Sequence, residues 1–331
     1  MVTYLVRRVL LAISVVAATI VAAFTLFFVA PSDPAGAICG QTRCSVERYN
    51  DIRASLHLDR PVAEQFAEYA LGIVKGRVFD DGGVVKDCPA PCLGYSYITG
   101  QPVTELLKNA FPITLTVVVG AAVIFFTFGV TMGSMAARRR GTSADRLLVG
   151  ATLVMSSIPY YLIALLIFLY FVLTFPVLPR PGYFPVGENG VGKWFIGFLV
   201  PWLVLGIYNS TSYARYARGS MVEALSEDYV RTARSKGISE ARVTYVHGLR
   251  AAITPVVTIF GLDVGGQLAG AIFTERIFDL PGMGRLVLES FVQSDLPVIM
   301  GTVIVGAVAL VIANLTVDIV YSFLDPRVKL A

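Results

Sequence analysis

Residues 221–255, MVEALSEDYVRTARSKGISEARVTYVHGLRAAITP, form a charged stretch with helical patterning between strongly apolar spans, and this stretch decides the fold. Basic residues recur along it, among them Arg231, Arg242 and Arg250. Because basic residues near membrane spans are retained on the cytoplasmic side, we expect this segment to lie inside the cell. There it is available to a soluble cytoplasmic partner.

The composition around this segment is typical of an integral membrane protein. Hydrophobic residues make up 55% of the 331 and charged residues 15%, against roughly 25% charged in a typical soluble domain, and the mean hydropathy is +0.69. These values argue against a soluble enzyme. Runs of the about 20 apolar residues needed to cross a bilayer predict an all-α membrane protein with six spans, near 9–30, 112–136, 148–175, 195–213, 254–274 and 298–322.

The placement of basic residues predicts the orientation of these spans. The first apolar run follows Arg7 and Arg8, and it is longer than the roughly 7 to 15 apolar residues of a secretory signal, so we interpret it as a retained span. Further arginines gather at 138–140, between spans two and three, and within 214–252. By the positive-inside rule, both termini are expected in the cytoplasm.

This topology divides the chain into four parts. Residues 1–30 hold the cytoplasmic N-terminus and the first span, and 31–111 form a long extracytoplasmic loop. Residues 112–322 hold the other five spans together with the charged loop 214–252, and 323–331 form a cytoplasmic tail.

All four cysteines, Cys39, Cys44, Cys88 and Cys92, fall in the extracytoplasmic loop, where thiols can oxidise. Disulfides are the favoured interpretation, and local pairing of Cys39 with Cys44 and Cys88 with Cys92 is one of three possible connectivities. A metal site is less favoured, because zinc sites usually show the spacing C-x2-C.

Two further features of this loop carry structural predictions. Apolar residues at helical spacing predict an amphipathic helix that packs on the rest of the protein or, less favoured, on the membrane: Val62, Phe66, Tyr69 and Ile73. The stretch FDDGGVVKDCPAPCLG at 79–94 is rich in Gly and Pro, and we interpret it as an irregular excursion closed by the second cysteine pair.

Within the spans, a few residues stand out. Pro159 lies in the third span and Pro201 in the fourth, where the proline ring and the missing backbone donor are expected to bend each helix. Asp318, near the inner end of the last span, is expected to pair locally with a basic residue.

The fifth span carries four glycines and one acid. Gly261, Gly265, Gly266 and Gly270 either let neighbouring helices approach closely or keep a central path wide enough for a substrate. Asp263 is expected to face protein or water, since a charge facing lipid is costly. It either lines a translocation path and attracts a cationic group or binds a neighbouring helix.

The segment DYVRTARSKG followed by SEARVTYVHGLRAAITPVV resembles the cytoplasmic EAA-type loop of ABC importer permeases, in the branch that imports dipeptides, oligopeptides and nickel. The resemblance extends over nearly the whole chain, through YLVRRVLLAI with PSDPA, HLDRPVAEQF, YITGQPVTELL, SSIPYY, TERIFDLPGMGRL and VDIVYSFLDPR. The chain departs from the usual pattern in the four outside cysteines, in the insertion near 78–93, and at Arg231, which replaces the acidic residue that names the loop.

The resemblance implies a type I importer fold in which a short helix of this loop docks into a groove of a cytoplasmic ATPase. The alternative is an amphipathic helix that rests on the inner leaflet. In the docking interpretation, Gly237 permits a sharp turn after the helix. The residues implied in docking are Asp228, Tyr229, Val230, Arg231, Ala233, Arg234, Lys236 and Gly237. Outside span five, charged residues are candidates for docking a binding protein or for shaping a gate: Glu275, Arg276, Asp279, Arg285 and Glu289.

The implied function is the permease subunit of a peptide importer in a bacterial or archaeal plasma membrane. Its implied partners are the lipid bilayer, a second related permease, two ATPase subunits, an extracytoplasmic solute-binding protein and a peptide, with no nucleic acid. The chain lacks a G-x-x-x-x-G-K-[ST] phosphate loop, so ATP and Mg are expected on the ATPases, with no cofactor here and no enzyme activity of its own. Alternatives are a permease for nickel chelates or another small solute, an ion-coupled secondary transporter, or a membrane scaffold.

Overall fold

The structure is a computed structural model, and it describes residues 2–26, 35–36, 45–46, 49–50, 53, 60–81 and 84–324. Cys39 and Cys44 lie outside the described residues, so their predicted pairing stays a prediction. The helices are α1 (Val2–Phe24), α4 (Val62–Lys75), α5 (Val103–Arg138), α6 (Ser143–Ser157), α7 (Tyr160–Ile167), α8 (Val186–Ser226), α9 (Asp228–Ser235), α10 (Glu240–Arg242), α11 (Leu249–Leu268), α12 (Ile272–Ile277), α13 (Met283–Val292) and α14 (Leu296–Leu324). Two π-helical segments, η2 (Phe168–Thr174) and η3 (Val243–Gly248), and two strands, β1 (Arg77–Asp81) and β2 (Val84–Cys88), complete them.

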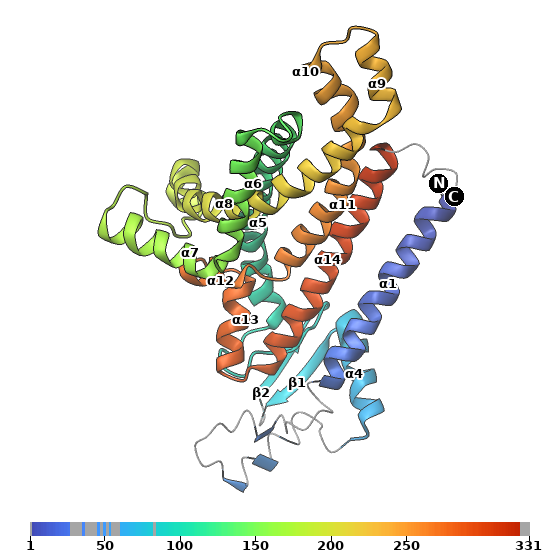
Figure 1. The fold of residues 1–331 in the computed structure, drawn as a ribbon. Coiled ribbons are helices and arrows are strands. Elements are labelled where there is room, and N and C mark those ends of the chain that lie inside the picture. The colour runs from blue at the N-terminus through green and yellow to red at the C-terminus, as the bar shows by residue number, and fades with distance from the viewer. Residues whose placement is uncertain are drawn as a thin grey trace.

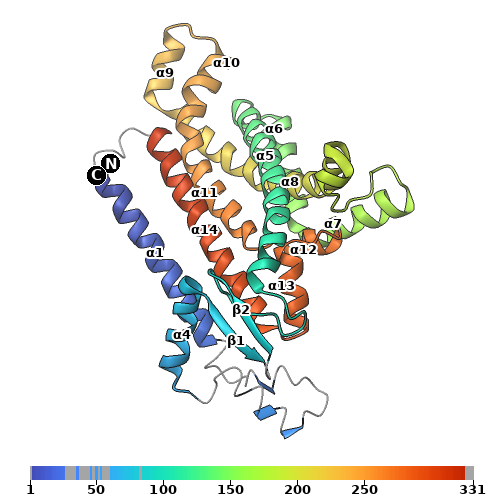
Figure 2. The same ribbon diagram turned by 180° about the vertical axis from the view of Figure 1, so that it is seen from behind.

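The long helices run between two ends of the molecule that carry different structures. In Figure 1, and from behind in Figure 2, α9 and α10 project at one end, which we call the loop end. The elements α4, β1 and β2 lie at the opposite end, which we call the hairpin end. The charged segment and the cysteine-bearing loop are therefore separated by the length of the spans.

The apolar runs of the sequence appear as membrane-spanning helices. Among the described residues, five helices are long and apolar enough to cross a bilayer, and a bent pair makes a sixth crossing if it counts as one span. The helices exceed the apolar runs: α5 begins at Val103 rather than near 112, and α8 covers Val186–Ser226, with a kink at Gly190, rather than 195–213. A multi-pass membrane protein with the predicted order of spans is confirmed.

The third span is broken where the sequence predicted a bend. Helix α6 and the segment Tyr160–Thr174 meet at an angle of 90°. Ile158 between them is extended, with φ −90° and ψ 129°, because a residue that precedes proline is sterically driven away from the α conformation. Pro159 then precedes the first residue of α7. The bend predicted at Pro159 is confirmed, and it separates two helices. Pro201 lies inside α8, whose non-helical residue is Gly190 instead, with φ 76° and ψ 163°.

The centre of the fold is the packing of α5 against α8. The ring centroids of Phe125 and Tyr213 lie 4.7 Å apart, and both side chains are fully buried. At Gly133 the two backbones approach so closely that a Cβ atom there would lie 2.4 Å from the carbonyl oxygen of Ala214. Small residues allow this approach, which supplies the van der Waals contact that holds helices together in lipid.

The loop between the first two spans packs at the hairpin end. The predicted amphipathic helix is confirmed as α4, which buries Tyr69. The rings of Phe66 and Tyr69 lie 5.3 Å and 6.0 Å from that of Phe24 at the end of α1. The helix thus packs on the protein, as the favoured interpretation required.

The prediction of an irregular excursion at 79–94 is wrong for its first half, because β1 and β2 form an antiparallel hairpin there. Arg77 pairs with Cys88 and Asp81 with Val84, which leaves Gly82 and Gly83 between the strands. A Gly-Gly pair between strand-forming residues is a known hairpin signal. Cys88 and Cys92 form a disulfide after the hairpin, as predicted, with their Cα atoms 5.5 Å apart.

Helix α1 is joined to the last span by an ion pair. The Nη1 atom of Arg8 lies 2.8 Å from Oδ2 of Asp318. The predicted basic partner of Asp318 is therefore the arginine that precedes the first apolar run.

The contact between α5 and α8 predicts unequal effects for two matched substitutions. Gly133→Ala should lower the midpoint of thermal unfolding in detergent, because its Cβ would meet backbone atoms that cannot move aside. Overpacking of this kind lowers the free energy of unfolding by about 1–3 kcal/mol. Gly219→Ala is the control, since Gly219 lies in α8 with open space around it and both variants gain the same helix propensity of about 1 kcal/mol. Equal midpoints for the two variants would contradict the close approach.

Candidate functional site

The charged segment forms a compact unit that we call the coupling loop, residues 227–248. Helix α8 ends at Ser226, and Glu227 alone separates it from α9. After a turn at Lys236–Ser239, α10, η3 and α11 run on as one helix, Glu240–Leu268. The loop is thus connected directly to two helices of the transmembrane body.

The turn after α9 is a Schellman motif. Gly237 has a φ of +74°, a left-handed conformation that favours glycine. Its backbone N–H donates to the carbonyl of Arg234, and the N–H of Ile238 donates to the carbonyl of Ala233, at 2.9 Å and 3.3 Å. These two bonds satisfy carbonyls that the end of the helix leaves open. The structure thus gives Gly237 the turn position that the sequence suggested.

A small apolar core holds the coupling loop together. Val230, Ala233 and Val243 are buried, with Leu225 and Ile238 packed against them. Val230 and Ala233 therefore face the loop's own interior. Tyr229, next to them on α9, stays 45% exposed. Burial of its hydroxyl and the charge of Glu227 raise the pKa of Tyr229, so the side chain stays neutral at physiological pH.

The outer face of the coupling loop is charged and exposed. Arg234 pairs with Glu240 through its Nε atom at 2.9 Å, which ties α9 to α10. Arg231 lies 3.7 Å from Asp228 in a pair that is almost fully exposed, and Lys236 is also exposed. Exposed pairs of this kind contribute only about 0–1 kcal/mol. The surface of α9 is therefore free to exchange its partners.

Asp263 on α11 accepts a hydrogen bond from a neighbouring helix. The hydroxyl of Tyr213 on α8, a residue that is 1% exposed, donates to its Oδ2 at 2.8 Å. Asp263 itself is exposed at the surface of the chain. It thus has the partner on a neighbouring helix that one of the two interpretations requires, and its place on a translocation path stays a prediction.

The four glycines of the fifth span have different surroundings. Gly261 and Gly265 face α14, where Cβ atoms would come within 1.9 Å of Val317 and 2.6 Å of Leu310. Gly266 has open space around it, and Gly270, with φ +144°, follows the end of α11 against the backbone of Gly284. Close packing therefore explains Gly261 and Gly265. Of the four glycines, only Gly266 lies within α11 and has open space beside it.

The charged residues beyond α11 also separate into two groups. Glu275 is fully buried, and its carboxylate accepts from the hydroxyl of Thr114 at 2.7 Å and from the N–H of Arg285 at 3.0 Å. The other four form exposed ion pairs in which Arg285 contacts Asp279 and Glu289, and Arg276 contacts Glu289. Glu275 is thus a structural carboxylate, and only the others are available at the surface.

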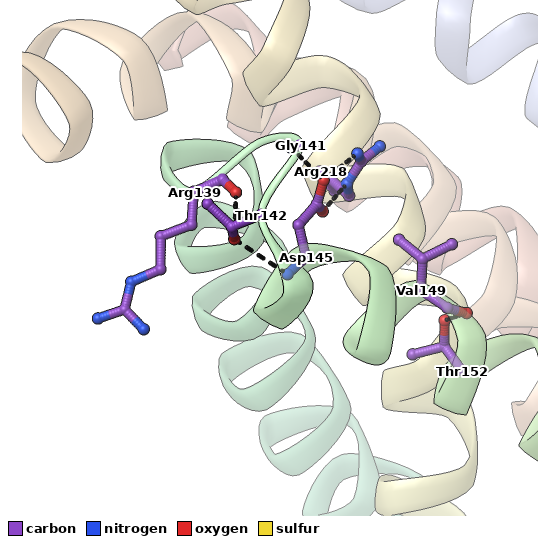
Figure 3. Close-up of polar contacts among 7 residues, drawn as sticks. All are labelled: Arg139, Gly141, Thr142, Asp145, Val149, Thr152 and Arg218. Carbon is purple, nitrogen blue, oxygen red and sulfur yellow. Dashed lines mark hydrogen bonds and ion pairs between the residues drawn. The ribbon is translucent and has the colours of Figure 1, made fainter.

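The sequence reasoning missed an ion pair that ties α6 to α8 (Figure 3). The Nε and Nη2 atoms of Arg218 lie 2.6 Å and 2.7 Å from the two oxygens of Asp145. Asp145 also accepts from the N–H of Gly141 at 2.9 Å, and its own N–H donates to the Thr142 hydroxyl at 3.4 Å. The spacing Thr142-x-x-Asp145 is a helix N-terminus signal, but nothing in the local sequence indicates Arg218 as the partner.

Two models of one protein family match the chain. The model described as "Binding-protein-dependent transport system inner membrane component" matches residues 129–330. The model of the corresponding N-terminal region matches residues 1–118.

Full-length relatives carry transport names. The chain is 32% identical over 326 residues to the "Probable peptide ABC transporter permease protein y4tP" of Sinorhizobium fredii, covering 98% of this chain and 99% of the relative. It is 33% identical over 352 residues to the "Dipeptide transport system permease protein DppB" of Escherichia coli K12, covering 99% of each.

The pair of Asp145 and Arg218 predicts a coupled loss of stability. Arg218→Ala should lower the free energy of unfolding by about 2 kcal/mol, because it leaves a carboxylate that is only 4% exposed without its charge partner. Arg146→Ala, a neighbouring exposed arginine, should change it by less than about 0.5 kcal/mol. In thermal unfolding of the detergent-solubilised protein, Asp145→Ala/Arg218→Ala should cost less than the sum of the single changes. Strict additivity would contradict the pairing.

Proposed function

The chain belongs to the family of binding-protein-dependent transport system inner membrane components, and we propose that it is the permease subunit of an ATP-driven peptide importer. In this proposal it forms half of a translocation path with a second, related permease. Two ATPase subunits bind one side of the pair, and a solute-binding protein delivers substrate to the other. Family membership supports this assembly.

The substrate class in this proposal is peptides. The names of full-length relatives support it, and they favour peptides over nickel chelates. An ion-coupled secondary transporter is not favoured, because it would leave the coupling loop without a function. ATP and Mg belong to the ATPases in this scheme, and this chain supplies the path and the contact.

The observation that carries the proposal is the construction of the coupling loop. It has its own apolar core, a charged outer face and direct links to α8 and α11. A loop packed in this way can transmit a displacement, because its two ends are continuous with long helices. We propose that the exposed face of α9, with Asp228, Tyr229, Arg231, Arg234 and Lys236, docks on the ATPase, while Val230, Ala233 and Gly237 keep the loop rigid.

The orientation follows from the same assignment. In the proposal the loop end faces the cytoplasm, together with both termini, and the hairpin end faces outward with the disulfide. The arginines at the loop end support this orientation. The hairpin end and the exposed charges of Arg276, Asp279 and Glu289 are then the surfaces offered to the binding protein.

Purified permeases and ATPases in liposomes, with the binding protein and peptide added, test the function directly. ATP hydrolysis should rise on addition of a dipeptide or oligopeptide together with the binding protein. Labelled peptide should accumulate on the side of the membrane opposite the binding protein. Hydrolysis that ignores peptide, with no uptake, would contradict the proposal.

The same assay tests the coupling loop. Gly237→Val should reduce uptake about tenfold or more while much of the ATP hydrolysis remains, because a β-branched residue cannot adopt the left-handed turn without strain. Gly100→Val is the matched control, since Gly100 also has a positive φ, of 66°, and open space, but lies outside the coupling loop. An equal ratio of uptake to hydrolysis in the two variants would contradict the role of the loop.

We also propose that Asp263 and Gly266 line the path on the exposed face of α11. Asp263→Asn should reduce uptake of a cationic peptide about fivefold more than that of an anionic peptide, because it removes an attraction of about 1 kcal/mol. Tyr213→Phe removes the hydrogen bond and keeps the charge, so it should affect both peptides equally. If Asp263→Asn also reduces uptake of the cationic and the anionic peptide equally, Asp263 has only a structural role.

A further inference from the structure

A cavity of about 200 Å³ lies between the end of α5 and the coupling loop. The residues that line it include the apolar Ala137 and Leu225. The charged lining residues are Arg138, Arg140, Arg234 and Glu240. At about 30 Å³ for each water molecule, the volume is sufficient for a phosphate group with part of its hydration shell.

The charges around this cavity do not balance. Glu240 is the one carboxylate among the lining residues, and it is paired with Arg234 at 2.9 Å. Arg138 and Arg140 are exposed and form no ion pair in the part of the chain that the structure describes. Arg140 lies near enough to Asp145 to stabilise its carboxylate electrostatically, but neither Arg138 nor Arg140 is paired with a carboxylate that lines the cavity.

We propose that this cavity binds a phosphate-bearing anion, supplied either by an anionic lipid headgroup or by a soluble phosphate compound. Guanidinium groups bind phosphate oxygens through paired N–H donors, and such charge-assisted bonds are stronger than neutral ones. In the orientation proposed above, the end of α5 is at the cytoplasmic side, where the anionic headgroups of the inner leaflet attract clustered arginines.

Occupancy of the cavity has a mechanical consequence. Arg138 is the last residue of α5 and Arg140 lies in the turn after it, whereas Arg234 belongs to α9. An anion held by both would bridge the body of the protein to the coupling loop, and it would compete with Glu240 for Arg234. The site therefore adds a regulated contact to the proposed coupling function. This consequence and the inner-leaflet placement rest on that function, whereas anion binding itself does not.

Arg139 provides a matched control. It lies between the two cavity arginines in the sequence but is not a lining residue. Figure 3 shows its side chain extending away from Asp145 on α6 and Arg218 on α8. Arg139→Gln therefore removes one charge at the same depth without changing the cavity.

The experiment uses the purified transporter assembly in nanodiscs and measures bound anion by native mass spectrometry. One arm contains phosphatidylcholine with phosphatidylglycerol and counts retained phosphatidylglycerol. The second contains phosphatidylcholine alone and titrates inorganic pyrophosphate. In whichever arm the wild-type assembly retains the anion, Arg138→Gln/Arg140→Gln should weaken its retention about tenfold. Arg139→Gln should change this retention less than twofold.

The arms identify the source of the anion. Retention in the phosphatidylglycerol arm identifies a lipid headgroup, retention in the pyrophosphate arm identifies a soluble phosphate, and either result supports the site. Absence of retention in both arms would overturn the proposal, as would equal losses for Arg139→Gln and the double variant. These measurements need no transport activity, so a failure here is distinguishable from a failure of the proposed function.

Discussion

The close contact between α5 and α8 is the constraint on which the rest of the structure depends. Lipid supplies little hydrophobic force between helices, so van der Waals contact must hold them together. Gly129 and Gly133 provide it, because each presents bare backbone to α8, against Tyr213 and Ala214 respectively. Near the same contact, Arg218 binds Asp145 and fixes α6 as well. The part of α8 that leads into the coupling loop is thereby held between α5 and α6.

The coupling loop and the Tyr213–Asp263 hydrogen bond join the same two helices at different depths. The loop connects α8 to α11 through a packed core of Val230, Ala233 and Val243, and the hydrogen bond connects them within the span. Two attachments limit how far α8 and α11 can move independently. A displacement applied to α9 should therefore move both helices together, and α11 carries the open surface beside Gly266.

The sequence predicts the spans and the special turns of this protein well, because hydropathy and proline act locally. Pro159 breaks the third span by disfavouring the α conformation at Ile158, whereas Pro112, Pro201 and Pro255 lie inside helices that continue past them. Neighbours distant in the chain decide the rest. Helical periodicity groups Val230 and Ala233 on one face, but it cannot say that this face packs on Val243 rather than on a partner. Likewise, only the position of α14 distinguishes Gly261 from Gly266, and only the fold brings Arg218 to Asp145.

The central claim is that α9 receives force through direct contact with an ATPase. Lys236 tests it most directly, because it is the only lysine in 214–252 and its side chain is exposed. In the native assembly, a short amine-to-carboxyl cross-linker followed by mass spectrometry should join Lys236 to acidic residues of the ATPase, with a yield that changes when ATP is added. If Lys236 cross-links to no nucleotide-hydrolysing subunit under any condition, the account is contradicted.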